Sequence, residues 1–194
     1  MTRILILYAT SHGHTRTIAQ AIADRLRSGE VRVTMVDLQG GQPLPALSEY
    51  DAVVLGSRVH FDRHAPALRA YVAANRRALA RLPCYLFSVS MAAAATPHTG
   101  DPHGYLARLS EELAWRPRMA VAFGGALPYR SYNPVMRWLM KQVSRRAGHP
   151  TDTTRDHVLT DWAAVRAFAD EVVACTLTDR VRVRDIRRAH DVVN

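Results

Sequence analysis

The first 26 residues constrain the fold more than any other part of the chain. Residues 4–8 form an uninterrupted apolar run, which is typical of a strand buried on both faces of a parallel sheet. A polar segment, residues 10–15, follows directly, and apolar residues then recur at helical spacing from Ile18 to Leu26. The sequence therefore predicts a strand, a hydroxyl-rich turn and a helix in immediate succession.

The turn predicts an anion-binding site. The first turn of a helix presents N–H groups without intrahelical acceptors and a partial positive charge, and Gly13 lets the backbone approach a ligand closely. The turn lacks both the Gly-Lys-Ser/Thr of nucleoside-triphosphate loops and the glycine fingerprint of dinucleotide sites. Hydroxyls and amides without a lysine favour a phosphate monoester, and an ordinary Ser/Thr helix cap is the alternative.

The spacing of Thr10, Gly13 and Thr15 resembles the loop that holds the FMN phosphate in flavodoxins. This resemblance implies FMN as the cofactor. It assigns the phosphate and its surroundings to the whole turn, namely Thr10, Ser11, His12, Gly13, His14 and Thr15. For the two histidines, an exposed position in the loop is the alternative.

Composition restricts the class of protein. The chain has 194 residues, of which 48% are hydrophobic and 22% charged, as expected for one globular α/β domain. No apolar run approaches the roughly 20 residues of a membrane span, and no signal peptide is expected. Cys84 and Cys175 have neither metal-binding nor redox spacing, so they are predicted to be buried free thiols in a reducing cytoplasm, with no metal.

The formal net charge of +9 points to an anionic partner. No helix-turn-helix, finger or aromatic RNA-binding signature occurs, so nucleic acid is not expected among the partners. Flavodoxins that only carry electrons are typically acidic, and the basic charge disfavours that role. An anionic membrane surface or an anionic small molecule therefore remains as the expected partner.

The rest of the chain alternates strands and helices. Further strands are predicted at residues 31–37, 52–56, 84–89 and 119–123, with loops at residues 57–64 and 90–104. The pattern predicts an α/β, flavodoxin-like, doubly wound five-stranded parallel sheet of order 2-1-3-4-5. The switch point between strands 1 and 3 would bring the loops after strands 1, 3 and 4 to one site.

The C-terminal third departs from this alternation. We expect a single domain over residues 1–176, with a helical insertion at residues 126–155 around the last strand and a short strand at residues 157–159. Thr160 and Asp161 cap a last helix. Residues 177–194 are basic, show no clear packing face and are predicted to be a flexible tail.

A series of motifs then narrows the resemblance. The segment from Gly125 to Tyr129, the Trp/Met/Arg/Lys helix after it, Asp152-Thr153 and Thr160-Asp161-Trp162 are similar to the flavodoxin-like protoporphyrinogen IX dehydrogenases of bacterial haem synthesis. The resemblance covers residues 1–174. It implies FMN-dependent oxidation of protoporphyrinogen IX, with electrons passed to a quinone, usually menaquinone. Residues 60–64 and 90–104 depart from the family pattern.

The same resemblance and topology place further residues around the flavin. Residues 57–64 should line one side of the isoalloxazine, where Phe61 either stacks on the ring or anchors the loop on the core. The additional cofactor-binding residues are Ser57, Phe61, Ser88, Val89, Ser90, Met91, Gly124 and Gly125. His60 and His64 are candidates for the catalytic proton acceptor, although an electron-rich macrocycle could react without a dedicated base.

The insertion is predicted to meet substrate or membrane. Basic residues recur four apart on its helix beside apolar ones, a pattern suited to an anionic bilayer. Arginines there could also bind porphyrin propionates. The assigned residues are Tyr129, Arg130, Arg137, Trp138, Lys141 and Arg145. The alternative is an amphipathic helix packed on its own domain.

Together these features predict a cytoplasmic protein peripherally associated with the inner face of the cell membrane, with a homodimer left open. Two other functions stay open, a flavodoxin-fold NAD(P)H-quinone reductase and an electron-transfer flavodoxin without a substrate of its own.

Overall fold

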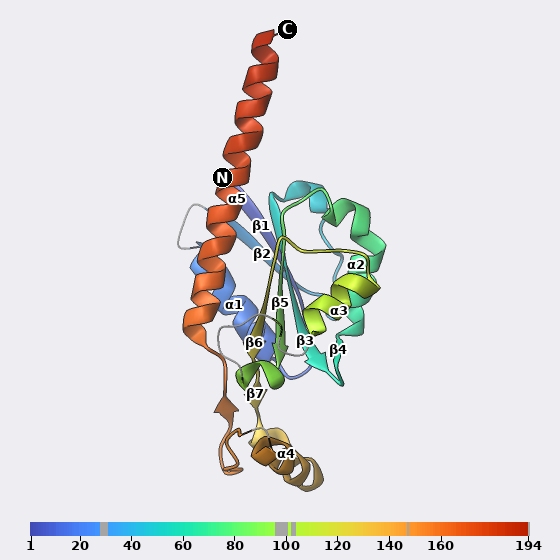
Figure 1. The fold of residues 1–194 in the computed structure, drawn as a ribbon, viewed down its shortest axis with the longest axis vertical. Coiled ribbons are helices and arrows are strands. Elements are labelled where there is room, and N and C mark those ends of the chain that lie inside the picture. Colours follow the sequence, from blue (N-terminus) through green and yellow to red (C-terminus); the bar gives the residue numbers. More distant parts are fainter. Residues whose placement is uncertain (28–30, 96–100, 102–103, 147, 194) are drawn as a thin grey trace.

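A central parallel sheet organises the molecule. The computed structural model describes residues 1–27, 31–95, 101, 104–146 and 148–193. Its parallel strands are β1 (Thr2–Ala9), β2 (Val31–Asp37), β3 (Ala52–His60), β5 (Cys84–Ser90) and β6 (Met119–Gly124). They lie in the order β2-β1-β3-β5-β6 (Figure 1). The predicted fold and strand order are confirmed.

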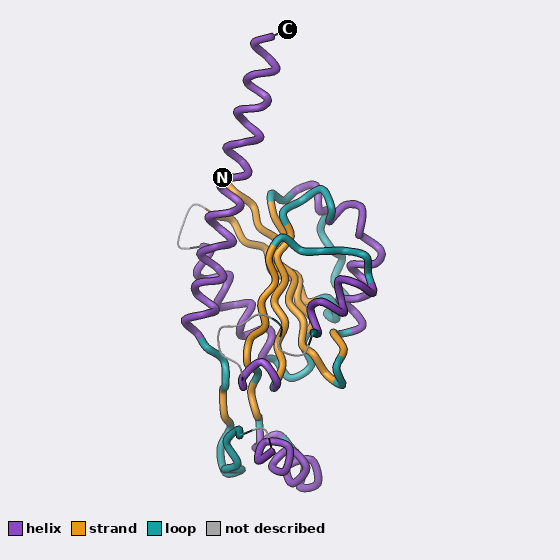
Figure 2. The backbone as a smooth tube through the Cα atoms, in the orientation of Figure 1, coloured by secondary structure: helices purple, strands orange, loops and turns teal. Residues whose placement is uncertain are grey.

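Helices cover both faces of this sheet (Figures 1 and 2). On one face, α1 (His14–Arg27) and α5 (Trp162–Val193) bury apolar side chains against alternate residues of β1, including Ile4 and Ile6. On the other face, α2 (Pro66–Leu79) and α3 (Tyr105–Glu112) pack against the intervening residues, including Leu5 and Leu7. Burial on both faces explains why the opening strand is a continuous apolar run. The described residues also form short 3-10 helices, namely η1 (Leu47–Glu49), η2 (Ala92–Ala95) and, between β7 (Ala126–Leu127) and α4 (Pro134–Arg146), η3 (Tyr129–Ser131).

The segment after β3 corrects a prediction. Residues 57–64 were expected to form a loop, but β3 continues to His60 and turns back into β4 (Arg63–His64), an antiparallel sixth strand. Phe61 and Asp62 form the two-residue turn with φ of 47° and 58°. Both values lie in the left-handed region that a type I′ hairpin turn requires; aspartate adopts this region more readily than most residues, whereas phenylalanine does not favour it.

The predicted insertion lies beyond the carboxyl ends of the main strands. There β7 (Ala126–Leu127) pairs antiparallel with β8 (His157–Val158), and α4 (Pro134–Arg146) lies between them in sequence. Figure 1 shows α4 at the far end of the molecule from the C-terminus. The short strand predicted around residue 157 is confirmed as β8.

Residues 177–194 were predicted to be a flexible tail. The described part of this segment continues the helix α5 through Val193 and extends away from the body (Figure 1). Within the described part of the chain, no helix combines the length and the apolar character needed to cross a bilayer.

The two cysteines are both free, but they differ in burial. Cys84 is buried, as predicted, and its Sγ donates to the Leu79 carbonyl, while burial raises the pKa of its thiol to about 12. Cys175 is only half-buried, so the prediction of burial is wrong for that residue.

Candidate functional site

A cavity of about 680 Å³ opens at the carboxyl ends of β1, β3 and β5. This is the switch point of the sheet, where ligands bind in doubly wound folds, and the volume is that of a small-molecule site. The insertion closes one side of it. The lining residues are Thr10–Thr17, Arg58, Val59, His60, Val89, Ser90, Met91, Gly125, Ala126, Pro128, Tyr132, Met136, Met140, Asp156 and Val158.

The turn after β1 is built to receive an anion. Thr10 Oγ1 accepts the Gly13 N–H at 3.1 Å, and the Gly13 carbonyl accepts the Thr17 N–H at 3.0 Å, which starts α1. The N–H groups of the three residues between therefore lack intrahelical acceptors. No acidic residue lies in the first turn of α1. The dipole and the amides together favour a phosphate here.

Gly13 keeps this turn open. Its φ is +83°, in the left-handed region that favours glycine, and a Cβ at this position would meet no atom within 4 Å. The glycine is therefore explained by backbone conformation and not by crowding. Open space at the end of a row of amides is what a phosphate cradle needs.

Arg58 supplies a charge that the sequence analysis did not single out. Its Nε is buried and, among the described residues, has no hydrogen-bond partner, while the side chain lines the cavity. A buried guanidinium donor without an acceptor is costly, so a ligand with an acceptor atom fits this cavity. Arg58 fell within a predicted loop, and no local pattern distinguished it.

Three residues predicted to bind the cofactor do not line the cavity. Ser57 is fully buried, and its hydroxyl donates to the Arg58 carbonyl and accepts the Ala65 N–H at 3.0 Å. Ser88 is fully buried within β5 and does not line the cavity, unlike its neighbours Val89, Ser90 and Met91.

Gly124 is the third of these residues. A Cβ there would lie 2.3 Å from the Leu159 carbonyl oxygen, so the close approach of two backbones requires this glycine. Gly125 does line the cavity, as predicted, and a Cβ there would make only ordinary contacts, the shortest being 3.5 Å to Ser90.

The β3–β4 hairpin separates the two candidate catalytic histidines. His60 is exposed and lines the cavity, and its ring centre lies 4.2 Å from that of Phe61. Phe61 itself is 88% exposed and does not line the cavity, so it neither stacks on a ligand there nor packs on the core.

His64 points away from the site. It lines a separate small cavity with Tyr105, Leu109 and Glu112 of α3, and burial lowers the pKa of its imidazole to about 4. Its ring is 4% exposed in a structural position. The prediction that His64 takes part in catalysis is therefore not supported by its placement.

The insertion contributes one wall of the cavity through residues that the sequence analysis missed. Tyr132, Met136 and Met140 line it, together with Asp156, whose Oδ1 accepts the Arg130 N–H at 2.8 Å. The i, i+4 spacing of the two methionines was the sequence feature that could have identified them as one face of the helix. Flexible thioethers beside an aromatic ring suit a large apolar ligand.

Two residues assigned to substrate or membrane are instead internal braces. Tyr129 is fully buried, with its hydroxyl 2.9 Å from Ser144 Oγ and 3.0 Å from the Pro150 carbonyl oxygen. Arg137 donates from Nε to the Tyr129 carbonyl at 3.0 Å and from a terminal nitrogen to the Tyr132 carbonyl. Neither side chain is available to a lipid or a propionate.

The other four residues of this assignment differ in exposure. Arg130 is exposed, and its Nε donates to the Thr154 carbonyl at 3.1 Å. Trp138 is 64% exposed, Arg145 is exposed and Lys141 is half-buried.

The alternative prediction for α4, a helix whose apolar side packs on its own domain, is not supported by the exposure of its residues. Ser144 is its one buried residue. Val135, Met136, Trp138, Leu139 and Val143 are all exposed.

Comparison with known proteins shows the family of this chain. A family model described as a flavodoxin domain matches residues 5–154. The chain is 34% identical over 177 residues to a protein of Leishmania major named protoporphyrinogen IX dehydrogenase (quinone), covering 90% of this chain and 76% of that protein. It is 29% identical over 175 residues to a protein of the same name from Escherichia coli K12, covering 90% and 96%.

Solved structures share the fold. An oxidised flavodoxin from Bacillus cereus aligns with a TM-score of 0.51 and 16% identity, covering 89% of this chain and 98% of that one. A short-chain flavodoxin associated with a bacterial microcompartment aligns with a TM-score of 0.52 and 12% identity, covering 91% and 99%. The chain therefore belongs to the flavodoxin-domain family, as a flavin-dependent oxidoreductase related to the two dehydrogenases.

Proposed function

We propose that the protein oxidises protoporphyrinogen IX to protoporphyrin IX with FMN and passes the electrons to a membrane quinone. The names of its relatives support the substrate and a quinone as acceptor. The observation that carries the proposal is one cavity that joins the anion-binding turn to the apolar wall of Tyr132, Met136 and Met140. An electron-transfer flavodoxin without a substrate of its own would not need that wall.

FMN fits the residues present. The turn from Thr10 to Thr15 would hold its phosphate through amides and hydroxyls, and the Arg58 guanidinium offers a buried donor to an acceptor on the ring system. A bound flavin would supply two-electron chemistry, so the six-electron oxidation of the macrocycle would need three turnovers, each reducing one quinone. The methionines and Tyr132 would exclude water and orient the macrocycle.

His60 is the proton acceptor that we assign. It lines the cavity, whereas His64 does not. Asp156 also lines the cavity, and its Oδ1 accepts the Arg130 N–H. The His60→Gln variant should lower kcat by about 100-fold at unchanged flavin content.

The test is an anaerobic assay of the flavin-loaded protein with protoporphyrinogen IX and a menaquinone analogue. We expect oxidation to depend on both FMN and the quinone. Quinone reduction driven by NAD(P)H without porphyrinogen would instead favour a NAD(P)H-quinone reductase. Flavin reduction only by a partner reductase, with no porphyrin formed, would favour an electron carrier.

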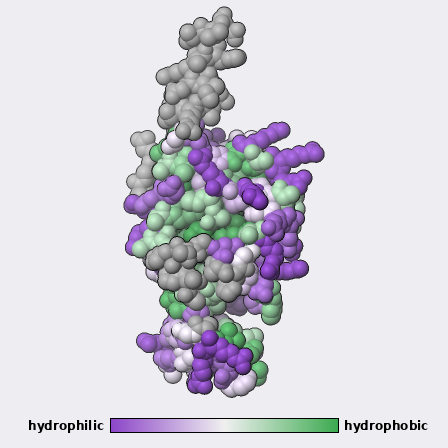
Figure 3. Space-filling view, viewed as in Figure 1, coloured by the Kyte–Doolittle hydropathy of each residue, from purple (hydrophilic) through white to green (hydrophobic). Residues whose placement is uncertain are grey.

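We further propose that α4 rests on the anionic cytoplasmic face of the membrane, where a quinone is dissolved. Its exposed apolar residues include Val135, Trp138 and Leu139, and its charged residues are four basic side chains without an acidic one. Figure 3 shows hydrophobic and hydrophilic residues side by side at this end of the molecule. An apolar stripe flanked by cations and an exposed tryptophan suits the interface of an anionic bilayer.

Vesicle binding tests the membrane proposal. We expect sedimentation with vesicles of phosphatidylglycerol and phosphatidylcholine, and weak binding to phosphatidylcholine alone. Val135→Gln with Leu139→Gln should weaken binding by about tenfold, while Leu44→Gln, an exposed leucine outside α4, serves as the matched control. Equal binding by both variants would contradict the proposal. Arg137 is unsuitable as a probe because it braces the insertion.

A further inference from the structure

The first residue of α1 takes part in a hydrogen-bonded chain that reaches across the sheet. His14 Nε2 lies 2.7 Å from Thr160 Oγ1, and Thr160 Oγ1 lies 2.6 Å from the Gly124 carbonyl oxygen. Thr160 is buried, and the His14 ring also contacts the edge of Trp162. The chain therefore ties the anion-binding turn to the end of β6 and to the start of α5.

Counting protons along this chain assigns the tautomer of His14. The Gly124 carbonyl has no proton, so the single hydroxyl proton of Thr160 must be donated to it. Thr160 Oγ1 can then only accept from His14, so Nε2 carries a proton in both charge states of the ring. The lone pair of the neutral imidazole is therefore on Nδ1.

His14 also belongs to the cavity. It lies between Gly13 and Thr15 in the turn that receives the anion, and it is among the cavity-lining residues. Burial lowers the pKa of its imidazole, so the ring is neutral at pH 7 without a ligand. A phosphate monoester carries a charge between −1.5 and −2 at this pH, and such a charge nearby favours the imidazolium.

We propose that His14 takes up one proton at Nδ1 when a phosphate monoester binds in the turn, so that the phosphate is held by an imidazolium anchored through Thr160 to the Gly124 carbonyl. This inference rests on the proposed function only for the identity of the ligand as FMN. It makes His14 a binding residue whose charge depends on the ligand.

Other charges around His14 do not replace this effect. On its own helix and turn these are Arg16 and His12, and across the cavity they are Arg58, His60 and Asp156. At the start of α5, Asp161 accepts the N–H groups of Ala163 and Ala164. Burial is the cause that lowers the pKa of the His14 imidazole, so the bound phosphate adds the deciding negative charge.

The measurement is calorimetric titration of the apoprotein with FMN between pH 7 and 9, in two buffers of different ionisation enthalpy. We expect uptake of about one proton near neutral pH. The affinity for FMN should fall by up to about tenfold per pH unit where the pH lies between the pKa of His14 in the free protein and its pKa in the bound protein. Riboflavin, which lacks the phosphate, should take up no proton.

Two variants make the test specific. His14→Gln keeps a side-chain donor for Thr160 but cannot titrate, so proton uptake should vanish while FMN still binds. His12→Gln, which changes the other histidine of the turn, should keep the uptake. Persistent uptake in His14→Gln would overturn the proposal.

The outcomes separate this inference from the proposed function. Tight FMN binding with no proton uptake by the unmodified protein would overturn the role of His14 and leave the cofactor assignment standing. Failure to bind FMN would overturn both. Nitrogen NMR of the ligand-free protein gives an independent check, because a His14 ring protonated at Nδ1 instead of Nε2 would contradict the tautomer.

Discussion

At the scale of single residues, His64 shows how a buried titratable group couples stability to pH. Its imidazole is enclosed by β4, α2 and α3, and the charged groups that act on it are Asp101, Arg69 and Glu112. Burial dominates and lowers the pKa of this group to about 4. The folded protein therefore holds His64 neutral over a pH range in which the unfolded chain protonates it.

The free energy of unfolding should consequently fall as the pH drops from about 6.5 to about 4. Above pH 6.5 the histidine is neutral in both states, so it adds no pH dependence to the free energy of unfolding. Between pH 6.5 and pH 4, only the unfolded state gains a proton. This lowers the free energy of unfolding by up to about 3 kcal/mol, because each unit of pKa difference corresponds to about 1.4 kcal/mol. Urea unfolding at several pH values should show a flatter profile for His64→Leu, with exposed His12→Gln as the control. An unchanged slope in His64→Leu would contradict the assignment.

The paired glycines after β6 allow a second test at this scale. Gly124→Ala places a methyl group 2.3 Å from the Leu159 carbonyl oxygen, so β6 and the segment before α5 must separate. Overpacking of this kind costs about 1–3 kcal/mol. Gly125→Ala meets its nearest atom at 3.5 Å and should unfold at nearly the same urea concentration as the unmodified protein. Equal midpoints for the two variants would show that this strand end is not close-packed.

At the scale of elements, α4 is held by polar braces and not by a core. Arg137 donates to two carbonyl oxygens, those of Tyr129 and Tyr132, and the Tyr129 hydroxyl bonds Ser144. Its apolar side chains are largely left exposed. The cavity wall formed by Met136 and Met140 therefore depends on these few hydrogen bonds.

Arg137→Met should loosen this helix more than the same change at Arg145. The substitution removes a charged donor and leaves two carbonyl oxygens unsatisfied. This lowers the local stability of α4 by about 1–3 kcal/mol. Arg145 is exposed, so Arg145→Met serves as the control. We expect faster hydrogen exchange of α4 amides and weaker binding of porphyrinogen in Arg137→Met, with flavin binding retained. Identical exchange rates in the two variants would rule out the bracing role.

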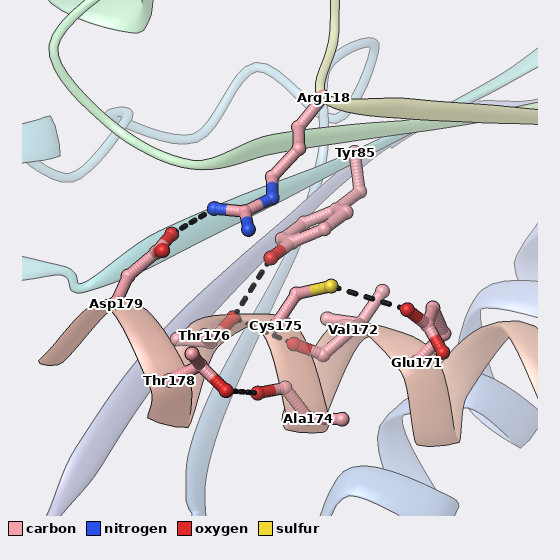
Figure 4. Close-up of polar contacts among 9 residues, drawn as sticks. All are labelled: Tyr85, Arg118, Glu171, Val172, Ala174, Cys175, Thr176, Thr178 and Asp179. Atoms are coloured by element: carbon pink, nitrogen blue, oxygen red, sulfur yellow. Dashed lines mark hydrogen bonds and ion pairs between the residues drawn. The ribbon is translucent and has the colours of Figure 1, made fainter. Parts of the chain in front are cut away.

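At the scale of the whole molecule, α5 connects the body to a helical extension. Figure 4 shows the contacts that fasten it, since the Tyr85 hydroxyl lies 3.2 Å from Thr176 Oγ1 and Arg118 pairs with Asp179. Thr176 donates its own proton to the Val172 carbonyl, so Tyr85 is the donor in the first contact. Beyond Asp179 the helix extends away from the sheet (Figure 1).

Truncation should therefore separate the two parts of α5. A chain ending after Arg180 keeps both fastening contacts, and its melting temperature and FMN affinity should match the full chain. A chain ending after Val173 loses Thr176 and Asp179, and the buried Tyr85 hydroxyl loses its partner, which costs about 1–3 kcal/mol. Thermal unfolding followed by circular dichroism distinguishes the two. Equal melting temperatures would mean that α5 is held by its apolar contacts alone.

The local sequence determined the fold class and the anion-binding turn. The apolar run of β1, the open conformation at Gly13 and the helical spacing from Ile18 are short-range features, so they can be recognised without a neighbour. The order of the parallel strands follows from the alternation of strands and helices. The predicted fold class and strand order are confirmed by the sheet topology.

Which of two consecutive residues on a strand faces the cavity depends on the tertiary structure. Successive residues on a strand point to opposite faces, so whether Ser57 or Arg58, and Ser88 or Val89, reaches the site depends on strand pairing and on what covers each face. Because β4 pairs with β3, His64 lies away from the cavity that His60 lines. Arg137 donates to a carbonyl oxygen of its own insertion, that of Tyr129. Such choices are set by contacts between distant segments, which a local pattern does not contain.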